Sequence, residues 1–336
     1  MEKPQVLVTC DMLPPWPEIL SQHCDVETVL DDNLTKDKIV KLLKDKDGLI
    51  CLVSDKIDAE IINTCNQLKV ISTYSVGYDH IDLSSATKNG IYVTNTPDVL
   101  TDATADLTWA LLMSIARRIA ESDKYVRDNK WKIAWAPKFM VGGDIFGQTL
   151  GIIGMGRIGQ AVAKRAQGFN MKILYYDMFK PNPKIIKDLN LQYKNLDELL
   201  KESDFISLHV ALNKDTHHII NEQKLKLMKS SAYLINASRG PVVDQKALTF
   251  ALKNKIIAGA GLDVYEKEPI ESNDPLLHLS NVILAPHIGS GSITSRTKMA
   301  ELAVNNLIYI LQGKSPISLV NEKVLSVKSL SNMRMI

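Results

Sequence analysis

Residues 150–160 read LGIIGMGRIGQ, and this stretch decides the fold class. An apolar run comes first, glycines follow at Gly154, Gly156 and Gly159, and the next residues, QAVAKRAQGF, form helices readily. In a strand–turn–helix unit, the first glycine permits a tight turn, the second lets the backbone approach a ligand, and the third lets the helix pack on the strand. The stretch therefore predicts a βαβ unit of an α/β protein.

Apolar runs on both sides of this stretch extend the pattern along the chain. The runs after it are almost continuously apolar, which is typical of parallel strands buried on both faces: KILYYD at 172, FISLHV at 205, AYLINAS at 232, IAGAGLDV at 257 and NVILAPH at 281. The runs before it alternate with helical segments: VLVTC at 6, GLICLV at 48, KVISTYS at 69 and IYVTN at 91. The sequence therefore predicts two doubly wound parallel-sheet domains.

The composition excludes several classes of protein. The 336 residues are 45% hydrophobic and 23% charged, which are ordinary globular proportions. The net charge of +2 disfavours a nucleic-acid binder, which would need a basic face. The chain lacks a signal peptide and any run of ~18 apolar residues, so we expect a cytoplasmic protein without a membrane span. Four cysteines without a CxxC spacing favour reduced thiols over a metal site.

An acidic residue completes a dinucleotide-binding pattern. Asp177 ends the run KILYYD, eighteen residues beyond Gly159. A carboxylate at this place accepts hydrogen bonds from the ribose 2′-hydroxyl, while the amides at the start of the helix face the pyrophosphate. The pattern predicts a nicotinamide dinucleotide as cofactor. NAD is favoured over NADP, because Asp177 would repel a 2′-phosphate.

Three chemically complementary residues follow later strands. Arg239 comes after AYLINAS, Glu268 lies in the loop after IAGAGLDV, and His287 closes NVILAPH. Doubly wound folds bind ligands outside the carboxyl ends of their strands. Arginine offers a fork for a carboxylate, histidine donates a proton near neutral pH, and a glutamate can stabilise the imidazolium. Any one of these three residues by itself would be interpreted as an ordinary paired or solvated side chain. Their joint placement favours a set of catalytic residues.

These segments resemble the D-2-hydroxyacid dehydrogenase family over roughly residues 5–324. The resembling motifs are SVGYDHID (75–82), TDATADLTWALL (101–112), LGIIGMGRIGQ (150–160), INASRGPVVD (235–244), GAGLDVYEKEP (259–269) and APHIGS (285–290). Within the family, GLICLVS (48–54) and AWAPKFMVGGDIFG (134–147) are most similar to glyoxylate/hydroxypyruvate reductases. The resemblance implies an NAD(P)-dependent oxidoreductase that reduces a small 2-keto acid.

The resemblance also implies roles for individual residues. Arg239 would bind the substrate carboxylate and polarise the keto group, His287 would exchange a proton with the substrate oxygen, and Glu268 would pair with His287. The implied substrate-binding residues are Leu52, Val76, Gly77 and Trp135. The residues implied to line the dinucleotide are Thr104, Gly154, Gly156, Arg157, Ile158, Gly159, Asp177, Ala237, Ser238, Asp263 and Gly289, and no metal is implied.

The domain arrangement expected from the family is discontinuous. A Rossmann-type cofactor domain would span residues 99–287, and a flavodoxin-like substrate domain would combine residues 1–98 with 288–318. The Ser/Lys-rich tail, 319–336, is expected to be poorly ordered. The helix from Thr101 and the aromatic arm at 128–146 carry more apolar surface than one loop buries within its own domain. We therefore expect a homodimer through 101–146, and the resemblance implies that Trp135 approaches the partner's active site.

Two alternatives stay open. One is another member of the family, such as a D-lactate or 3-phosphoglycerate dehydrogenase. The other is a dinucleotide-sensing interaction protein, because the family includes corepressors that retain the same Arg, Glu and His. The lack of a basic or low-complexity binding segment disfavours the second alternative. NADH consumption with glyoxylate would separate an enzyme from a scaffold.

Overall fold

The computed structural model describes residues 2–31 and 34–336, and the chain folds into two units. The first unit comprises residues 1–100 and 291–336, and the second comprises residues 101–290. The chain therefore enters the second unit at Thr101 and returns to the first at Gly291. Within the described ranges, no helix combines the length and the apolar character needed to cross a membrane.

The first unit is built on a five-stranded parallel sheet in the order β2-β1-β3-β4-β5. Its strands are β1 (Gln5–Val8), β2 (Asp25–Thr28), β3 (Gly48–Cys51), β4 (Val70–Thr73) and β5 (Tyr92–Thr94). Its helices are α1 (Trp16–His23), α2 (Lys36–Leu43), α3 (Ala59–Thr64), α4 (Leu83–Lys88) and α12 (Ile293–Leu311). This strand order is that of flavodoxin-like folds, as the resemblance implies.

The second unit is built on a seven-stranded parallel sheet in the order β12-β11-β10-β9-β6-β7-β8. Its strands are β6 (Thr149–Ile153), β7 (Lys172–Tyr176), β8 (Leu191–Tyr193), β9 (Phe205–Leu208), β10 (Tyr233–Asn236), β11 (Gly259–Leu262) and β12 (Val282–Leu284). Its helices are α5 (Thr101–Ala116), α6 (Ile119–Arg127), α7 (Arg157–Ala166), α8 (Pro183–Asp188), α9 (Leu196–Glu202), α10 (Glu222–Leu225) and α11 (Gln245–Lys253). From β6 the strands follow in chain order in both directions, β7 and β8 on one side and β9 to β12 on the other, and this arrangement defines a Rossmann-type sheet.

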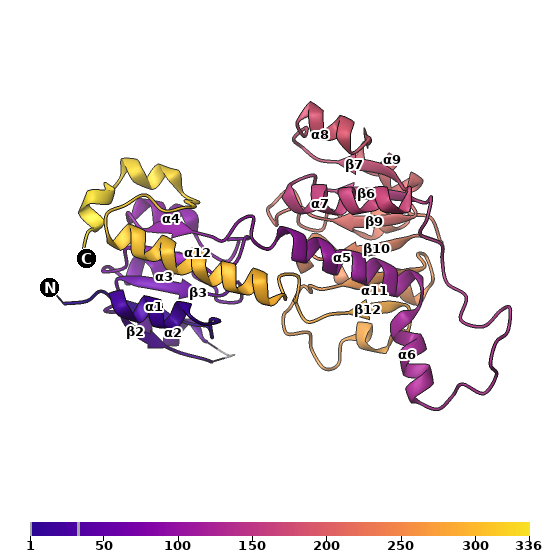
Figure 1. The fold of residues 1–336 in the computed structure, drawn as a ribbon, viewed down its shortest axis with the longest axis horizontal. Helices are drawn as coiled ribbons and strands as arrows, with labels where there is room; N and C mark the ends of the chain where they lie inside the picture. Colours follow the sequence, from indigo (N-terminus) through magenta and orange to yellow (C-terminus); the bar gives the residue numbers. More distant parts are fainter. Residues whose placement is uncertain (1, 32–33) are drawn as a thin grey trace. The chain divides into compact units, whose positions relative to one another are not determined.

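Helices cover both faces of the second sheet, which explains its continuously apolar strands. Ile152 packs in the core that also contains Trp109 of α5, whereas the next residue, Ile153, packs in the core that contains Leu248 of α11. Figure 1 shows α5 and α7 lying across one face of this sheet. Because successive side chains of a strand point to opposite faces, both must be apolar when both faces are covered.

The expectation of a poorly ordered tail is wrong. Residues 319–336 contain two short 3-10 helices, η4 (Glu322–Ser326) and η5 (Leu330–Met333), and the side chains of Val324 and Met333 are fully buried. Asn321 pairs with the edge strand β5, because its Oδ1 accepts a hydrogen bond from the Val93 amide at 2.9 Å and its Nδ2 donates to the carbonyl of Ile91 at 2.9 Å. The tail is therefore part of the first unit.

Candidate active site

The three glycines of the turn after β6 have the geometry that the motif predicts. Gly154 has φ +95°, and a Cβ there would lie 2.6 Å from the carbonyl of His209, which follows β9. A Cβ on Gly159 would lie 2.1 Å from the carbonyl oxygen of Gly154, so α7 packs directly on the turn. A Cβ on Gly156 would meet no atom within 4 Å. The turn thus presents bare backbone to open space, as a pyrophosphate-binding turn requires.

Asp177 lies against this turn. Its Oδ2 accepts a hydrogen bond from the Met155 amide at 2.6 Å, and its Oδ1 accepts one from the Phe179 amide at 2.9 Å. Each carboxylate oxygen has a second lone pair, so both can still accept a hydroxyl. The amides of Arg157 and Ile158 open α7, where a helix has no carbonyl of its own for them. These groups fit a dinucleotide whose ribose and pyrophosphate lie along the turn.

A second cluster brings together three predicted cofactor residues. Asp263 follows β11 and is 1% exposed, and its two carboxylate oxygens accept hydrogen bonds from the amides of Ile288 (2.7 Å) and Gly289 (2.8 Å). Burial raises the pKa of this carboxyl. A Cβ on Gly289 would lie 3.2 Å from Asp263 Oδ2 and 3.4 Å from Thr104 Cγ2. Thr104, Asp263 and Gly289 are therefore neighbours in the fold.

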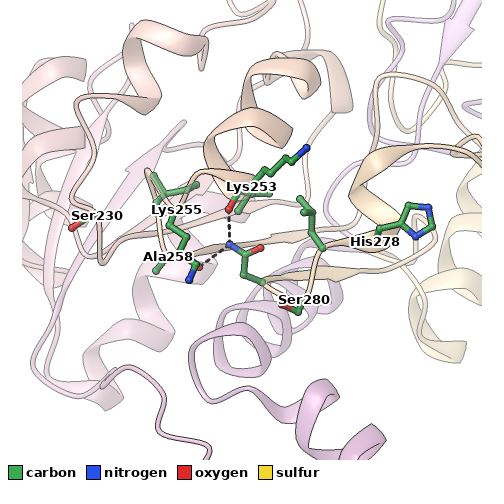
Figure 2. Close-up of a pocket in the computed structure, with 10 residues that line it drawn as sticks. Ser230, Lys253, Lys255, Ala258, His278 and Ser280 are labelled. Carbon is green, nitrogen blue, oxygen red and sulfur yellow. Dashed lines mark hydrogen bonds between the residues drawn. The ribbon is translucent and has the colours of Figure 1, made fainter.

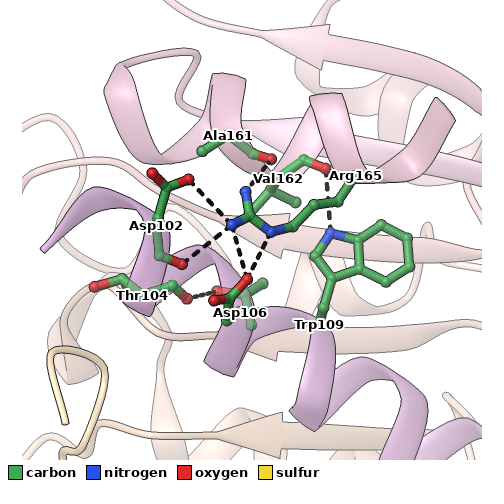
Figure 3. Close-up of polar contacts among 8 residues, drawn as sticks. Asp102, Thr104, Asp106, Trp109, Ala161, Val162 and Arg165 are labelled. Carbon is green, nitrogen blue, oxygen red and sulfur yellow. Dashed lines mark hydrogen bonds and ion pairs between the residues drawn. The ribbon is translucent and has the colours of Figure 1, made fainter. Parts of the chain in front are cut away.

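The position of Thr104 is fixed by contacts between α5 and α7 (Figure 3). Arg165 of α7 donates hydrogen bonds from Nε to Asp106 at 2.8 Å and from a terminal nitrogen to Asp102 at 3.0 Å. The indole of Trp109 donates to the carbonyl of Val162 at 3.2 Å. Exposed ion pairs contribute little stability, but this set defines the placement of the first turns of α5. Thr104 is thereby held beside the glycine-rich unit.

The turn that carries Arg239 is shaped by Asn236, a residue that sequence reasoning missed. Asn236 ends β10 and is buried; its Oδ1 accepts hydrogen bonds from the Ser238 amide and hydroxyl, and its Nδ2 donates to the Arg239 carbonyl at 2.9 Å. Ala237 and Ser238 are half-buried in the same turn, as is Arg239. A polar residue that closes an otherwise apolar strand is the signal that could have identified Asn236.

Glu268 and His287 form the pair that the sequence predicts. The His287 Nδ1 lies 2.6 Å from Glu268 Oε2, and Glu268 Oε1 accepts a hydrogen bond from the Tyr265 amide at 2.9 Å. A carboxylate only accepts, so Nδ1 carries the proton of this bond and Nε2 is the ring nitrogen left for a substrate. His287 has φ +53°, a region that few residues other than glycine adopt.

Tyr265 connects the loops of this pair and was also missed from the sequence. Its backbone amide donates a hydrogen bond to Glu268, and its hydroxyl donates one to the carbonyl of Ala285 at 2.9 Å, two residues before His287. Burial of the ring raises the pKa of Tyr265 to about 12, so the hydroxyl stays a donor at neutral pH.

The predicted residues of the first unit follow β3 and β4. The carbonyls of Val76 and Gly77 accept hydrogen bonds from Asn95 Nδ2 (2.8 Å) and Ser75 Oγ (2.6 Å). Neither amide donates to an acceptor within residues 2–31 and 34–336, which leaves both for a ligand. The amide of Leu52 donates to buried Asp55 at 2.8 Å. Sequence reasoning did not identify Asp55 or Asn95.

Trp135 and a surface pocket lie outside these clusters. Trp135 is 76% exposed in the irregular segment between α6 and β6. The pocket in Figure 2 lies at the amino ends of strands, where Asn281 before β12 donates hydrogen bonds to the carbonyls of Leu252 (3.1 Å) and Ala258 (3.2 Å). Ligands of this fold bind at the carboxyl ends, so the pocket is on the opposite edge from the site.

The fold and the site together define a dinucleotide-dependent dehydrogenase. A glycine-rich turn, an acid after β7, and an arginine, a glutamate and a histidine after later strands lie at one edge of a Rossmann-type sheet. Residues 109–289 match the family model described as D-isomer specific 2-hydroxyacid dehydrogenase, NAD binding domain. The chain belongs to this family.

Relatives within the family refine the assignment. The chain is 51% identical over 327 residues to a glyoxylate reductase of Korarchaeum cryptofilum, covering 97% of this chain and 98% of that one. It is 49% identical to a glyoxylate reductase of Thermofilum pendens over the full length of both. Among solved structures, an NADPH-dependent glyoxylate/hydroxypyruvate reductase of Sinorhizobium meliloti, in complex with NADP and malonate, has a TM-score of 0.83 at 30% identity and covers 96% of this chain and 98% of its own.

Proposed function

We propose that this protein reduces a small 2-keto acid, glyoxylate or hydroxypyruvate, with a nicotinamide cofactor. The observation that carries the proposal is the Glu268–His287 pair at 2.6 Å, which leaves the His287 Nε2 for a substrate oxygen. Arg239 follows a strand of the same sheet, at the edge where both loops lie. The relatives whose printed names are glyoxylate reductase support this choice of substrate class.

The residues divide the chemistry among them. When bound, the nicotinamide supplies the hydride that reaches the keto carbon. The Arg239 guanidinium holds the substrate carboxylate and polarises the keto oxygen. His287 donates a proton from Nε2 to the keto oxygen as negative charge develops there. Glu268 keeps the ring oriented and stabilises the imidazolium that provides this proton.

A panel assay tests this proposal. Purified protein with NADH should reduce glyoxylate and hydroxypyruvate with higher kcat/KM than pyruvate or 3-phosphohydroxypyruvate. Highest activity with one of the latter two would instead indicate a D-lactate or 3-phosphoglycerate dehydrogenase. Cofactor binding without turnover of any keto acid would contradict an enzymatic role and favour an interaction protein.

The finer proposal on the cofactor is a preference for NADH over NADPH. Asp177 lies against the glycine-rich turn, and its carboxylate would repel a 2′-phosphate by about 1–3 kcal/mol after screening. Lys180, the nearest basic residue along the same loop, is exposed and free to extend into water. We therefore expect NADH to be favoured about 10–10²-fold in kcat/KM, since each 1.4 kcal/mol is tenfold.

Kinetics with both cofactors at saturating glyoxylate check this preference. Asp177→Ala should reduce the preference for NADH over NADPH, mainly by lowering the KM for NADPH, because the variant lacks the charge that repels the 2′-phosphate. Lys180→Ala is the matched control and should change the NADH parameters little. Equal use of both cofactors by the wild type would mean that the basic neighbours Lys180 and Arg157 outweigh Asp177, or that the Asp177 side chain does not face the ribose.

We also propose a homodimer through α5, α6 and the arm at 128–146. The arm lacks helix and strand and exposes Trp131 (53%), Ile133 (65%) and Trp135 (76%). Its far end is fixed, because the Gly143 amide donates to the carbonyl of Ala116 in α5 at 2.8 Å. An apolar surface of this kind favours association with a second copy.

Sedimentation at micromolar concentration checks the homodimer. The wild type should sediment as a dimer, and Trp135→Asp should shift it toward monomer, because a carboxylate would have to be desolvated in the interface. Phe250→Asp is the matched control, since Phe250 is 54% exposed on α11 and outside the arm. A monomeric wild type would refute the proposed assembly.

A further inference from the structure

A second histidine–glutamate pair lies beside the candidate catalytic pair. His218 Nε2 is 2.6 Å from Glu266 Oε1, and the two side chains are 35% and 31% exposed. His218 follows β9 and Glu266 follows β11, so both lie on loops at the edge of the sheet where Arg239 and Glu268 also lie. The proposed mechanism uses neither residue.

The pair joins the loop of Glu268 to the segment after Arg239. On one side, the His218 amide donates to the carbonyl of Pro241 at 2.8 Å, inside the 3-10 turn η2 (Gly240–Val242) that directly follows Arg239. On the other side, the Glu266 amide donates to Gln245 Oε1 at 3.0 Å, and Glu266 Oε1 accepts from the Gln245 amide at 3.3 Å. Glu266 is thus held at both its backbone and its side chain.

The backbone connects Glu266 to the Glu268–His287 pair. Tyr265 precedes Glu266, and its amide donates to Glu268 Oε1, while Glu268 Oε2 holds His287. The Tyr265 carbonyl packs tightly on Gly240, where a Cβ would lie 1.8 Å from its oxygen. A shift of Glu266 would therefore move the donor that orients the Glu268 carboxylate.

We propose that Glu266, held by His218 and Gln245, is a positioning residue for the Glu268–His287 pair. It fixes the turn at 265–268 so that the Tyr265 amide and His287 each keep one oxygen of Glu268. An isolated surface ion pair contributes little to stability. We therefore expect the His218–Glu266 pair to affect the geometry of the Glu268–His287 pair and the rate of proton donation. This inference rests on the proposed function.

Glu266→Ala tests the inference. With the keto acid that the wild type reduces best, this variant should lower kcat about tenfold, while the KM for NADH and the thermal unfolding temperature stay near the wild-type values. Glu266→Gln should recover most of the rate, because its amide oxygen still accepts from His218 and Gln245. Glu271→Ala is the matched control: it removes an exposed partner of Lys267 on the same loop and should leave kcat unchanged.

A double-mutant cycle separates positioning from a general loss of structure. In a Glu268→Gln background, Glu266→Ala should have little further effect on kcat, since residues that act through one another are not additive. Independent effects, or a Glu266→Ala variant as active as Glu271→Ala, would overturn the inference and leave the proposed function intact. A wild type that reduces no keto acid would overturn both.

Discussion

Arg239→Lys should lower kcat/KM for glyoxylate by about 10²–10³ or more, equivalent to roughly 3–5 kcal/mol of lost transition-state stabilisation. Lysine keeps the positive charge but replaces a planar fork, which can hold a carboxylate and a carbonyl together, with a single ammonium point charge. The backbone of this turn is fixed independently by Asn236, which donates to the Arg239 carbonyl. The variant should therefore keep its fold and its affinity for NADH.

Steady-state kinetics of the folded variant decide this prediction. Arg127→Lys is the matched control, because Arg127 forms its exposed ion pair with Asp123 within α6. That exchange should change kcat/KM by no more than a few-fold. An Arg239→Lys enzyme within a few-fold of the wild type would show that this guanidinium does not bind the substrate.

His287→Asn should lower kcat by about 10²–10⁴, the usual contribution of a positioned general acid. Asparagine cannot donate a proton to the keto oxygen, but it tolerates the left-handed backbone that His287 adopts at φ +53°. The amide at this position can still donate to the carbonyl of Asp263, which it meets at 2.9 Å. The loss should therefore fall on the chemical step, and fluorescence titration should give an unchanged Kd for NADH.

A second histidine serves as the control for this substitution. His278 ends η3 (Pro275–His278) and lines the pocket at the amino ends of the strands. His278→Asn should therefore leave kcat unchanged. If His287→Asn retained kcat within tenfold of the wild type, another group would have to supply the proton.

The strands could be predicted where both of their faces are buried. Ile152 and Ile153 serve cores on opposite faces, so the run around them is apolar throughout and easy to recognise. The edge strands β2 and β8 have the sequences DVET and LQY and are largely exposed, so no apolar run marks them. Their existence depends on pairing with β1 and β7.

The packed tail could not be predicted for a related reason. Its polar composition is typical of a disordered end, and only Val324 and Met333 are fully buried. The side chain of Asn321 forms hydrogen bonds with the backbone at β5, where a neighbouring strand would otherwise pair. A hydrophobic pattern does not indicate such side-chain hydrogen bonds.

In the candidate site, residue types with a direct chemical role could be predicted, whereas supporting residues could not. Arg239, Glu268 and His287 carry groups whose chemistry is evident from the sequence. Tyr265 and Asn236 act through backbone amides and carbonyls that come together only after the strands have paired.

The proposed reduction of a 2-keto acid by the site around Arg239, Glu268 and His287 is tested most directly by the product formed. Purified protein should convert glyoxylate to glycolate with one NADH oxidised per glycolate formed, and His287→Asn at equal concentration should lose nearly all of both signals. NADH oxidation without glycolate, no turnover at all, or equal turnover by the variant would contradict the account.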